Sequence, residues 1–448
     1  MSFDGQTTNS RWLNCLYATL TAMMVSHAVA QEPTWRSLEN MSPEDLALYD
    51  PARATPRDTA IPYIPAEPYP FEAPYTSEEI GYRSAEFPHV PRWSASMIDV
   101  YGVVTSSGYI NQGASVFFQT IHGTTGLGGY IHDTTPGDVY ARWAFYDTFP
   151  PESEGAQQLW TPFRTDNEFR TKMDFFIYSP QLRRVRRQPE PRRDQRFPDN
   201  SQTFDDVLGR DPWELEWQLL GTDVLFETVR FPNTRPTITL NISGQGFVER
   251  QTASLKLMGD NFDHYGPGGG TKCWVIKATM KPDWLPGYKE RNLVLWLEQT
   301  TFYPLRIEKY GHDGRLMLIE ERIGKKENPA LGEFGYTALA SVYWNLDHDL
   351  VSYSFHDALK VRDWTKEQEK MIFTAEFMRR QWLFEPIKSQ MRIDSPDKFF
   401  LRSYLYPDKF TNDRNVTLPP EIDLRYRAQE AAGHLIFETG VFPSQSKK

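Results

Sequence analysis

The residues whose type and spacing most clearly suggest a chemical role are seven arginines in the segment from Arg183 to Arg196. A guanidinium group binds a phosphate or a carboxylate through two parallel hydrogen bonds. Carboxylates follow shortly after the arginines. The first four arginines therefore have three open interpretations: they bind an anionic head group, they dock an acidic partner, or they pair with these acids inside the protein. The arginines concerned are Arg183, Arg184, Arg186 and Arg187, and the acids are Asp205, Asp206, Asp211, Glu214 and Glu216.

The sequence offers little for catalysis. It contains no G-x-S-x-G elbow, no H-E-x-x-H helix and no C-x-x-C pair. Asp263 and His264 precede a glycine run that lacks the lysine and serine of a phosphate-binding loop. Asp347, His348 and Asp349 are adjacent, so they cannot all face one ion from a strand. We expect no enzymatic activity, no metal and no cofactor, although a hydrolase with a polar pocket stays an alternative.

The elements that position these residues have the pattern of β-strands. Apolar, aromatic and β-branched runs recur at short intervals, separated by turn residues and without intervening helices. We predict a mainly β protein with one large, curved antiparallel sheet. The predicted strands span residues 101–106, 114–120, 139–146, 157–163, 173–179, 215–221, 224–230, 253–259, 273–280, 292–299, 304–310, 315–322, 339–346 and 351–356.

Several of these strands are apolar on both faces. Trp274 and Ile276 share one side of their strand, while Cys273 and Val275 share the other. A sheet with one face in water alternates more cleanly, so something must cover the second face. Helices, a proline-rich segment or a hydrophobic ligand would do so. Residues 366–383 place apolar side chains on one helical stripe, and residues 424–435 do the same.

The beginning of the chain predicts export. Arg11 precedes an apolar run at residues 12–25, and Ala28, Val29 and Ala30 suit signal cleavage. An uncleaved signal anchor is the alternative. Cleavage would remove Cys15 and leave Cys273 alone, so no internal disulfide is expected. The net charge of −10 argues against a nucleic-acid partner. Together these features indicate the periplasm of a Gram-negative envelope.

Composition suggests four parts. Residues 1–30 are the predicted signal peptide. Residues 31–95 contain eleven prolines and predict an extended strap that packs on the body, with a disordered linker as the alternative. Residues 96–360 hold the predicted sheet domain. Residues 361–448 form a partly helical C-terminal extension that we expect to pack on the sheet.

Two signatures resemble an exported proteobacterial family of unknown function, DUF1329, which is related to the LolA and LolB carriers of outer-membrane lipoprotein sorting. The first comprises YSPQLRRVRRQP, TFDDVLG and WQLLGTDVLFE. The second spans residues 272–322. In the family, this signature has a tryptophan strand, then an arginine-led strand, an acidic residue with a tryptophan or another aromatic residue, and a Y-D-x-x-G hairpin. This chain departs from the family at Glu298, Gln299 and Phe302, where an acidic pair and a tryptophan are commoner. The positions that correspond to the family's elements are Trp274, Arg291, Glu298, Phe302, Tyr310, Asp313 and Gly314.

This resemblance implies an unclosed half-barrel with helices covering the concave side, whose concave face takes acyl chains. It also implies an inner-membrane exporter and an outer-membrane protein as partners. We therefore expect a periplasmic carrier that moves a lipid or other hydrophobic molecule between the two membranes. The alternative is a non-enzymatic envelope interaction module that partners an exporter without carrying lipid. That module predicts a packed concave face and an exposed arginine hairpin with unpaired guanidinium groups.

A carrier needs a dry concave surface and no catalytic apparatus. Each buried CH₂ group contributes about 0.8 kcal/mol, so an acyl chain can supply most of the binding energy. We expect six apolar side chains to line this surface, and each is equally compatible with ordinary core packing. They are Phe175, Ile177, Trp274, Ile276, Leu293 and Leu295.

Overall fold

The computed structural model describes part of the chain. The described residues are 35–66, 71–84, 94–104, 110–121, 135–149, 152–166, 172–197, 200–225, 237–242, 246–251, 271–300, 302–326, 336–348, 350–361, 366–380 and 435–436. All of them belong to the second of two compact units, Trp35–Lys448, and not to Met1–Thr34. The predicted export signal, Asp263, His264, Asp349, the strand at 253–259 and the helix at 424–435 lie outside the described residues.

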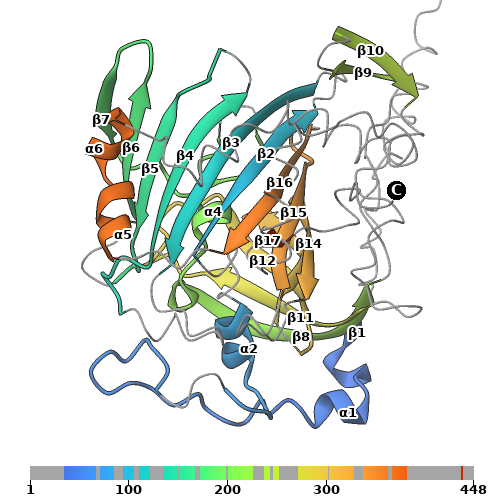
Figure 1. Ribbon diagram of the computed structural model, residues 1–448. Helices are drawn as coiled ribbons and strands as arrows, with labels where there is room; N and C mark the ends of the chain where they lie inside the picture. The colour runs from blue at the N-terminus through green and yellow to red at the C-terminus, as the bar shows by residue number, and fades with distance from the viewer. Residues whose placement is uncertain are drawn as a thin grey trace, which may run out of the picture. The chain divides into compact units, whose positions relative to one another are not determined.

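One open antiparallel sheet dominates the described part of the chain (Figure 1). Its path is β1-β8-β11-β12-β13-β14-β15-β16-β2-β3-β4-β5-β6-β7, and β17 pairs with β16. Since β1 and β7 end this path without pairing to each other, the sheet is not closed into a barrel. The predicted fold class, a mainly β protein with an unclosed antiparallel sheet, is confirmed.

The strands of the sheet agree closely with the alternating runs of the sequence. They are β1 (Arg36–Ser37), β2 (Ala95–Val104), β3 (Ile110–Ile121), β4 (Ala141–Phe149), β5 (Gln157–Pro162), β6 (Met173–Ser179), β7 (Arg184–Gln188), β8 (Leu215–Leu225), β11 (Thr271–Met280), β12 (Glu290–Glu298), β13 (Pro304–Gly311), β14 (Leu316–Lys326), β15 (Tyr336–Asn345), β16 (Leu350–Val361) and β17 (Leu435–Ile436). A second sheet pairs β9 (Thr237–Ile242) with β10 (Gly246–Gln251). Residues 215–221 and the start of 224–230, predicted as two strands, form the single strand β8.

Burial on both faces of the central strands follows the sequence pattern. In β11, Trp274 and Ile276 lie on one face, Cys273 and Val275 lie on the other, and all four have 0% exposed surface. Such strands need a second layer on each side, because exposed apolar faces of this size would be unfavourable in water.

Short helices supply the layer on one of these sides. The proline-rich segment contains η1 (Leu38–Asn40), α1 (Pro43–Leu46) and α2 (Ser77–Ser84). Ile80 of α2 packs into the core beneath β8 and β11, and Gly81 lies flat on the Trp217 ring, where a Cβ atom would approach to 2.0 Å. The segment after β7 forms α4 (Phe204–Leu208) and η2 (Pro212–Glu214).

The contacts of α4 show that the sheet curls around it. The Phe204 ring lies 5.6 Å from the ring of Trp160 on β5, while Asp206 forms an ion pair with Lys309 on β13. Seven strand spacings separate β5 from β13 in the sheet order, which would be about 34 Å in a flat sheet. Two residues of one helix that are only two positions apart cannot span this distance. The face that carries α4 is therefore the concave face.

The C-terminal helices cover the opposite face. The predicted helix over residues 366–383 is divided into α5 (Lys366–Ile372) and α6 (Ala375–Arg380). Phe373, Phe377 and Met378 pack against Phe118 and Leu159, whose side chains point away from α4. The helices that cover the concave side thus come from before β2 and from between β7 and β8.

Candidate functional site

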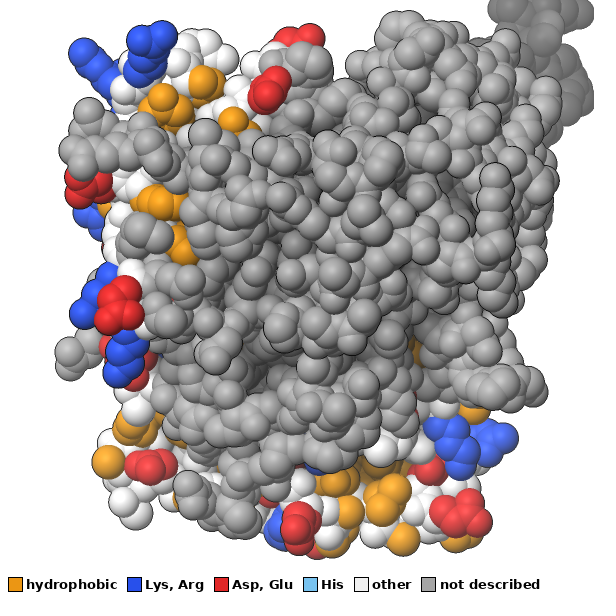
Figure 2. All heavy atoms as spheres, in the orientation of Figure 1, with side chains coloured by type: hydrophobic (Ala, Val, Ile, Leu, Met, Phe, Trp, Pro, Cys, Tyr) orange, Lys and Arg blue, Asp and Glu red, His pale blue; other side chains and the backbone are white. Residues whose placement is uncertain are grey.

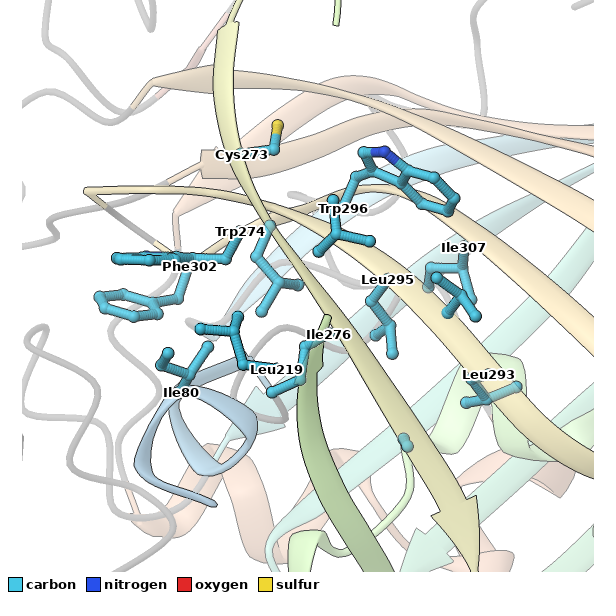
Figure 3. Close-up of a cluster of buried hydrophobic side chains, with 14 of the residues drawn as sticks. Ile80, Leu219, Cys273, Trp274, Ile276, Leu293, Leu295, Trp296, Phe302 and Ile307 are labelled. Atoms are coloured by element: carbon cyan, nitrogen blue, oxygen red, sulfur yellow. The ribbon is translucent and has the colours of Figure 1, made fainter. Parts of the chain in front are cut away.

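Two of the apolar clusters along the sheet reach its concave face. In the first, side chains of β8, β11, β12 and β13 pack against α2 and the loop before β13 (Figure 3). Ile276 and Leu219 lie beside Ile80 in this view. The second cluster contains Phe117, Trp143, Trp160 and Met173, which pack against residues of α4 and η2. Both clusters place large apolar side chains on the concave face.

The predicted ligand-lining residues fall into two groups. Four of them belong to the first cluster, where Trp274 and Ile276 are 0%, Leu293 3% and Leu295 6% exposed. Their concave-side neighbours include Leu219 and Ile307, which are also buried. Phe175 and Ile177 lie on β6 and are partly buried. The structure thus does not gather the six in one place, and their role in ligand contact stays a prediction.

An aromatic row crosses the concave face between β3 and β6. The Phe117 and Phe145 rings stack at 4.6 Å, Phe145 lies 5.1 Å from Trp160, and Trp160 lies 5.7 Å from Phe175. We call Phe117, Phe145, Trp160 and Phe175 the aromatic row. Phe145 and Phe175 are partly buried, and Ile177 is paired with Gln158 beside them. This part of the concave face therefore keeps apolar surface that the described residues do not fully cover.

We call residues 192–197 and 200–214 the plug segment, and they fill the concave face next to this row. Two capping boxes shape the segment locally. Thr203 and Asp206 close the start of α4, and Asp211 and Glu214 close the start of η2. Each box satisfies backbone N–H groups that would otherwise be buried without partners. The sequence T-F-D-D shows the first of these boxes, and it was the signal for a helix that our sequence analysis missed.

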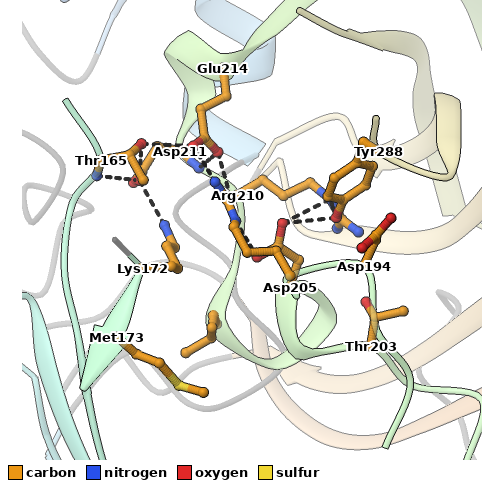
Figure 4. Close-up of polar contacts among 12 residues, drawn as sticks. Thr165, Lys172, Met173, Asp194, Thr203, Asp205, Arg210, Asp211, Glu214 and Tyr288 are labelled. Atoms are coloured by element: carbon orange, nitrogen blue, oxygen red, sulfur yellow. Dashed lines mark hydrogen bonds and ion pairs between the residues drawn. The ribbon is translucent and has the colours of Figure 1, made fainter. Parts of the chain in front are cut away.

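Buried ion pairs fix one end of the plug segment (Figure 4). Asp211 accepts a hydrogen bond from Lys172 Nζ at 2.7 Å and another from Arg164 at 2.8 Å. The backbone N–H and the hydroxyl of Thr165 each donate to the same carboxylate at 2.9 Å. The Asp211 side chain is 0% exposed, so this cluster joins the plug segment to residues that follow β5 and precede β6, in a dry environment.

A second group of ion pairs fixes the rest of the segment. Arg193 donates to Asp205 at 2.8 Å and to Glu214 at 2.7 Å. The Tyr288 hydroxyl donates to the other Asp205 oxygen at 2.8 Å (Figure 4). Asp206 pairs with Lys309 of β13 and with Arg210. The segment is thereby anchored to strands on both sides of the curved sheet.

Electrostatics keeps the carboxylates of Asp211 and Asp206 ionised. Burial alone would raise the pKa of Asp211, but the charges of Lys172 and Arg164 outweigh burial and hold its pKa well below 3.8. Burial is likewise outweighed at Asp206, whose pKa Lys309 and Arg210 hold well below 3.8. Carboxylates so occupied by donors are poor acids, bases or nucleophiles. The network therefore acts as an anchor for the plug segment.

The first four arginines of the arginine-rich stretch lie outside this ion-pair network. Arg183, Arg184 and Arg186 are exposed on the β6–β7 hairpin, and none forms an ion pair with a residue that the structure describes. Arg187 pairs with Asp174, and both side chains are accessible, at 68% and 32%. The described ion pairs of the acidic stretch are formed with Arg164, Lys172, Arg193, Arg210 and Lys309. Internal pairing with this stretch is therefore the wrong interpretation for the hairpin arginines.

Asp347, His348 and Cys273, which the sequence analysis also considered, each have partners or surroundings that the structure defines. Asp347 pairs with Arg315, and the backbone N–H of His348 donates to Asn345. Burial raises the pKa of the Cys273 thiol well above its usual value of 9.0, so this thiol stays protonated at neutral pH. Within the described ranges, no three His, Cys, Asp or Glu side chains are placed to hold one metal ion.

Comparison with known proteins defines the family. Residues 103–379, more than half of the chain, match the family model of the protein family of unknown function DUF1329. The chain belongs to the DUF1329 family. The comparison with curated proteins found no match.

Solved structures similar to this DUF1329 chain include another family member. The DUF1329 protein from Desulfovibrio piger is 13% identical, with a TM-score of 0.45 and coverage of 67% of this chain and 97% of that one. A domain assigned to outer membrane lipoprotein sorting from Vibrio parahaemolyticus is 12% identical, with a TM-score of 0.43 and coverage of 64% and 92%. A LolA superfamily protein from Nitrosomonas europaea is 15% identical, with a TM-score of 0.39 and coverage of 68% and 99%.

Proposed function

We propose that this DUF1329 protein is a periplasmic carrier that binds a lipid or another hydrophobic molecule and moves it between the inner and outer membranes. The observation that carries the proposal is the aromatic row on the concave face of an open sheet. Aromatic rings at this spacing form a continuous apolar surface, on which an acyl chain can bury many CH₂ groups. Binding of this kind needs no catalytic residue.

In this proposal the cargo lies along β4, β5 and β6. Phe175 and Ile177 line the site directly, because both are partly buried on this surface. Trp274, Ile276, Leu293 and Leu295 are packed in the first cluster, which α2 covers. They contact cargo when α2 moves away. The four therefore extend the site rather than form its entrance.

The proposed location is supported by the sequence at the start of the chain. The apolar run at residues 12–25 and the small residues at 28–30 have the pattern of a cleavable export signal. Among the helices that the structure describes, none has the length and apolar character needed to cross a membrane.

A specific observation also favours a second function. The plug segment fills part of the concave face with ion-paired residues, and three hairpin arginines have no ion pair among the described residues. Both features match the interaction module, which would bind an inner-membrane exporter or an outer-membrane protein and carry no lipid. In that case the plug segment would be a permanent part of the core.

Mass spectrometry of organic extracts from gently purified protein distinguishes the two functions. The carrier should release a stoichiometric lipid or hydrophobe. Ile177→Asn should reduce this amount, because it places an amide on the apolar surface. Val185→Asn is the matched control, since Val185 is also partly buried on the same hairpin but faces the side of α6. An empty protein that still retains an envelope partner would establish the interaction module instead.

A further inference from the structure

The turn between β6 and β7 exposes a leucine among arginines. Leu182 is 56% exposed, the highest value for a large hydrophobic side chain in the described part of the chain, where Leu46 and Leu48 reach 44% and 38%. Arg183 and Arg184 follow it directly and are exposed. The Leu182 backbone N–H donates to Ser179 at 3.3 Å, which fixes the turn. An apolar side chain is thus held at the tip of an extended hairpin.

The arginines surround this tip on both faces of the hairpin. The register pairs Ile177 with Arg186 and Ser179 with Arg184, so these two arginines point toward the concave side. Arg187 lies on the opposite side, next to Asp174. Figure 2 shows basic and hydrophobic side chains protruding together at the upper left, where Figure 1 places the β6–β7 turn.

The charge of the tip contrasts with that of the chain. The full sequence carries a net charge of −10, which repels an anionic surface, whereas the hairpin presents four guanidinium groups, with Asp174 beside Arg187 and Glu154 next to Gly155, which lies against Pro180. A molecule with this distribution approaches an anionic surface with its hairpin first. Guanidinium groups then pair with phosphates, and a leucine at the tip can enter the apolar boundary below them.

We propose that the β6–β7 hairpin docks this protein on an anionic phospholipid membrane, with Leu182 inserted and the four arginines in the head-group layer. The shape of the hairpin favours a membrane over an acidic protein. A stable protein interface buries about 800 Å² on each partner, usually over a broad patch. Here the basic groups point to opposite sides of a narrow turn, and a fluid head-group layer can contact all of them at once. The inference does not depend on the nature of any cargo.

Co-sedimentation with vesicles tests the proposal. The full chain should bind vesicles in which about a third of the lipid is phosphatidylglycerol, should bind phosphatidylcholine vesicles much less, and should dissociate as salt is added. Each arginine near an anionic surface contributes about a fivefold increase in binding. The triple variant R183Q/R184Q/R186Q should therefore bind on the order of 100-fold more weakly. Its circular dichroism spectrum and thermal midpoint should match those of the wild type, because these side chains are exposed.

Matched variants control for charge and for the N-terminus. R36Q/K272Q/K289Q removes the same charge from exposed positions outside the hairpin and should bind as the wild type does. Leu182→Ser should weaken binding about fivefold, while Leu46→Ser, at another exposed leucine, should not. All variants share residues 1–34, so a contribution of that segment cancels. Equal binding to both kinds of vesicle, or an equal loss in the control triple, would overturn the proposal. So would a hairpin triple that binds vesicles normally but loses an acidic protein partner.

Discussion

Arg186 and Arg193 belong to one arginine-rich stretch, yet their environments are opposite. The Arg186 side chain is exposed on β7, at the edge of the sheet. The Arg193 side chain is 13% exposed and bridges Asp205 and Glu214. The two differ because the chain leaves the sheet after β7 and turns into its concave side. The same residue type thus anchors the plug segment in one place and remains available for binding in the other.

The largest expected loss of stability follows from removing a buried ion pair of the plug segment. Asp211→Asn removes the negative charge that Lys172 and Arg164 share in a dry site. Loss of one partner of a buried ion pair typically costs about 3–5 kcal/mol. Urea unfolding followed by tryptophan fluorescence measures this loss.

The matched control is Asp174→Asn, which removes the exposed partner of Arg187. Exposed ion pairs contribute about 1 kcal/mol or less. Equal destabilisation by the two substitutions would contradict the distinction between buried and exposed arginine partners.

Arg193→Lys should cause the second-largest loss in the free energy of unfolding. A lysine keeps the charge but cannot reproduce the fork that joins Asp205 to Glu214. We expect a loss of about 1–3 kcal/mol in the free energy of unfolding, from charge-assisted hydrogen bonds that are no longer made. Arg186→Lys should leave this free energy unchanged. Urea unfolding of both variants gives the difference directly, and an unaffected Arg193→Lys protein would show that the fork contributes nothing.

Acid should weaken the anchoring of the plug segment. In the folded protein the pKa values of Asp206 and Asp211 lie below the ordinary 3.8. A lowered folded-state pKa gives stability that is fully present above the unfolded value and is lost as pH falls through the folded one. The free energy of unfolding should therefore decrease below about pH 4. Asp211→Asn should show a shallower decrease, because one titrating group is gone. Equal slopes for the variant and the wild type would mean that Asp211 titrates normally.

The smallest effect concerns the strain at the hairpin tip. Arg183 has a φ of 50°, a left-handed conformation that glycine adopts without steric cost. Arg183→Gly should change stability by less than about 1 kcal/mol, with a gain expected if relief of strain exceeds the entropy that glycine adds to the unfolded chain. Vesicle binding should fall about fivefold in the same variant. A clear loss of stability would show that the arginine side chain supports the turn, contrary to its exposed position.

Much of the fold could be predicted because strand patterns are local. The run at residues 173–179 has the bounds of β6, and the two apolar faces at residues 273–280 are both buried in β11. The helix α4 was missed because five residues are too few for a periodic signal. Its capping box was the available cue.

The partners of the acidic stretch could not be predicted from spacing. Asp206 pairs with Lys309, which lies 103 residues further along the chain. This contact exists because the sheet curls until β13 faces α4, and curvature depends on the twist and register of many strands together. Proximity in sequence suggested the hairpin arginines as partners. The backbone path into the concave face instead gave that role to Arg193 and Arg210.

The most direct test of the carrier function is to label the protein with a photoreactive fatty acid and identify the cross-linked residues by mass spectrometry. The concave site predicts labels on β4, β5 and β6, including Phe175 or Ile177, and a lower yield in Ile177→Asn than in Val185→Asn. Labels confined to α5 and α6 on the opposite face, or spread evenly over the surface, would contradict a binding site on the concave face.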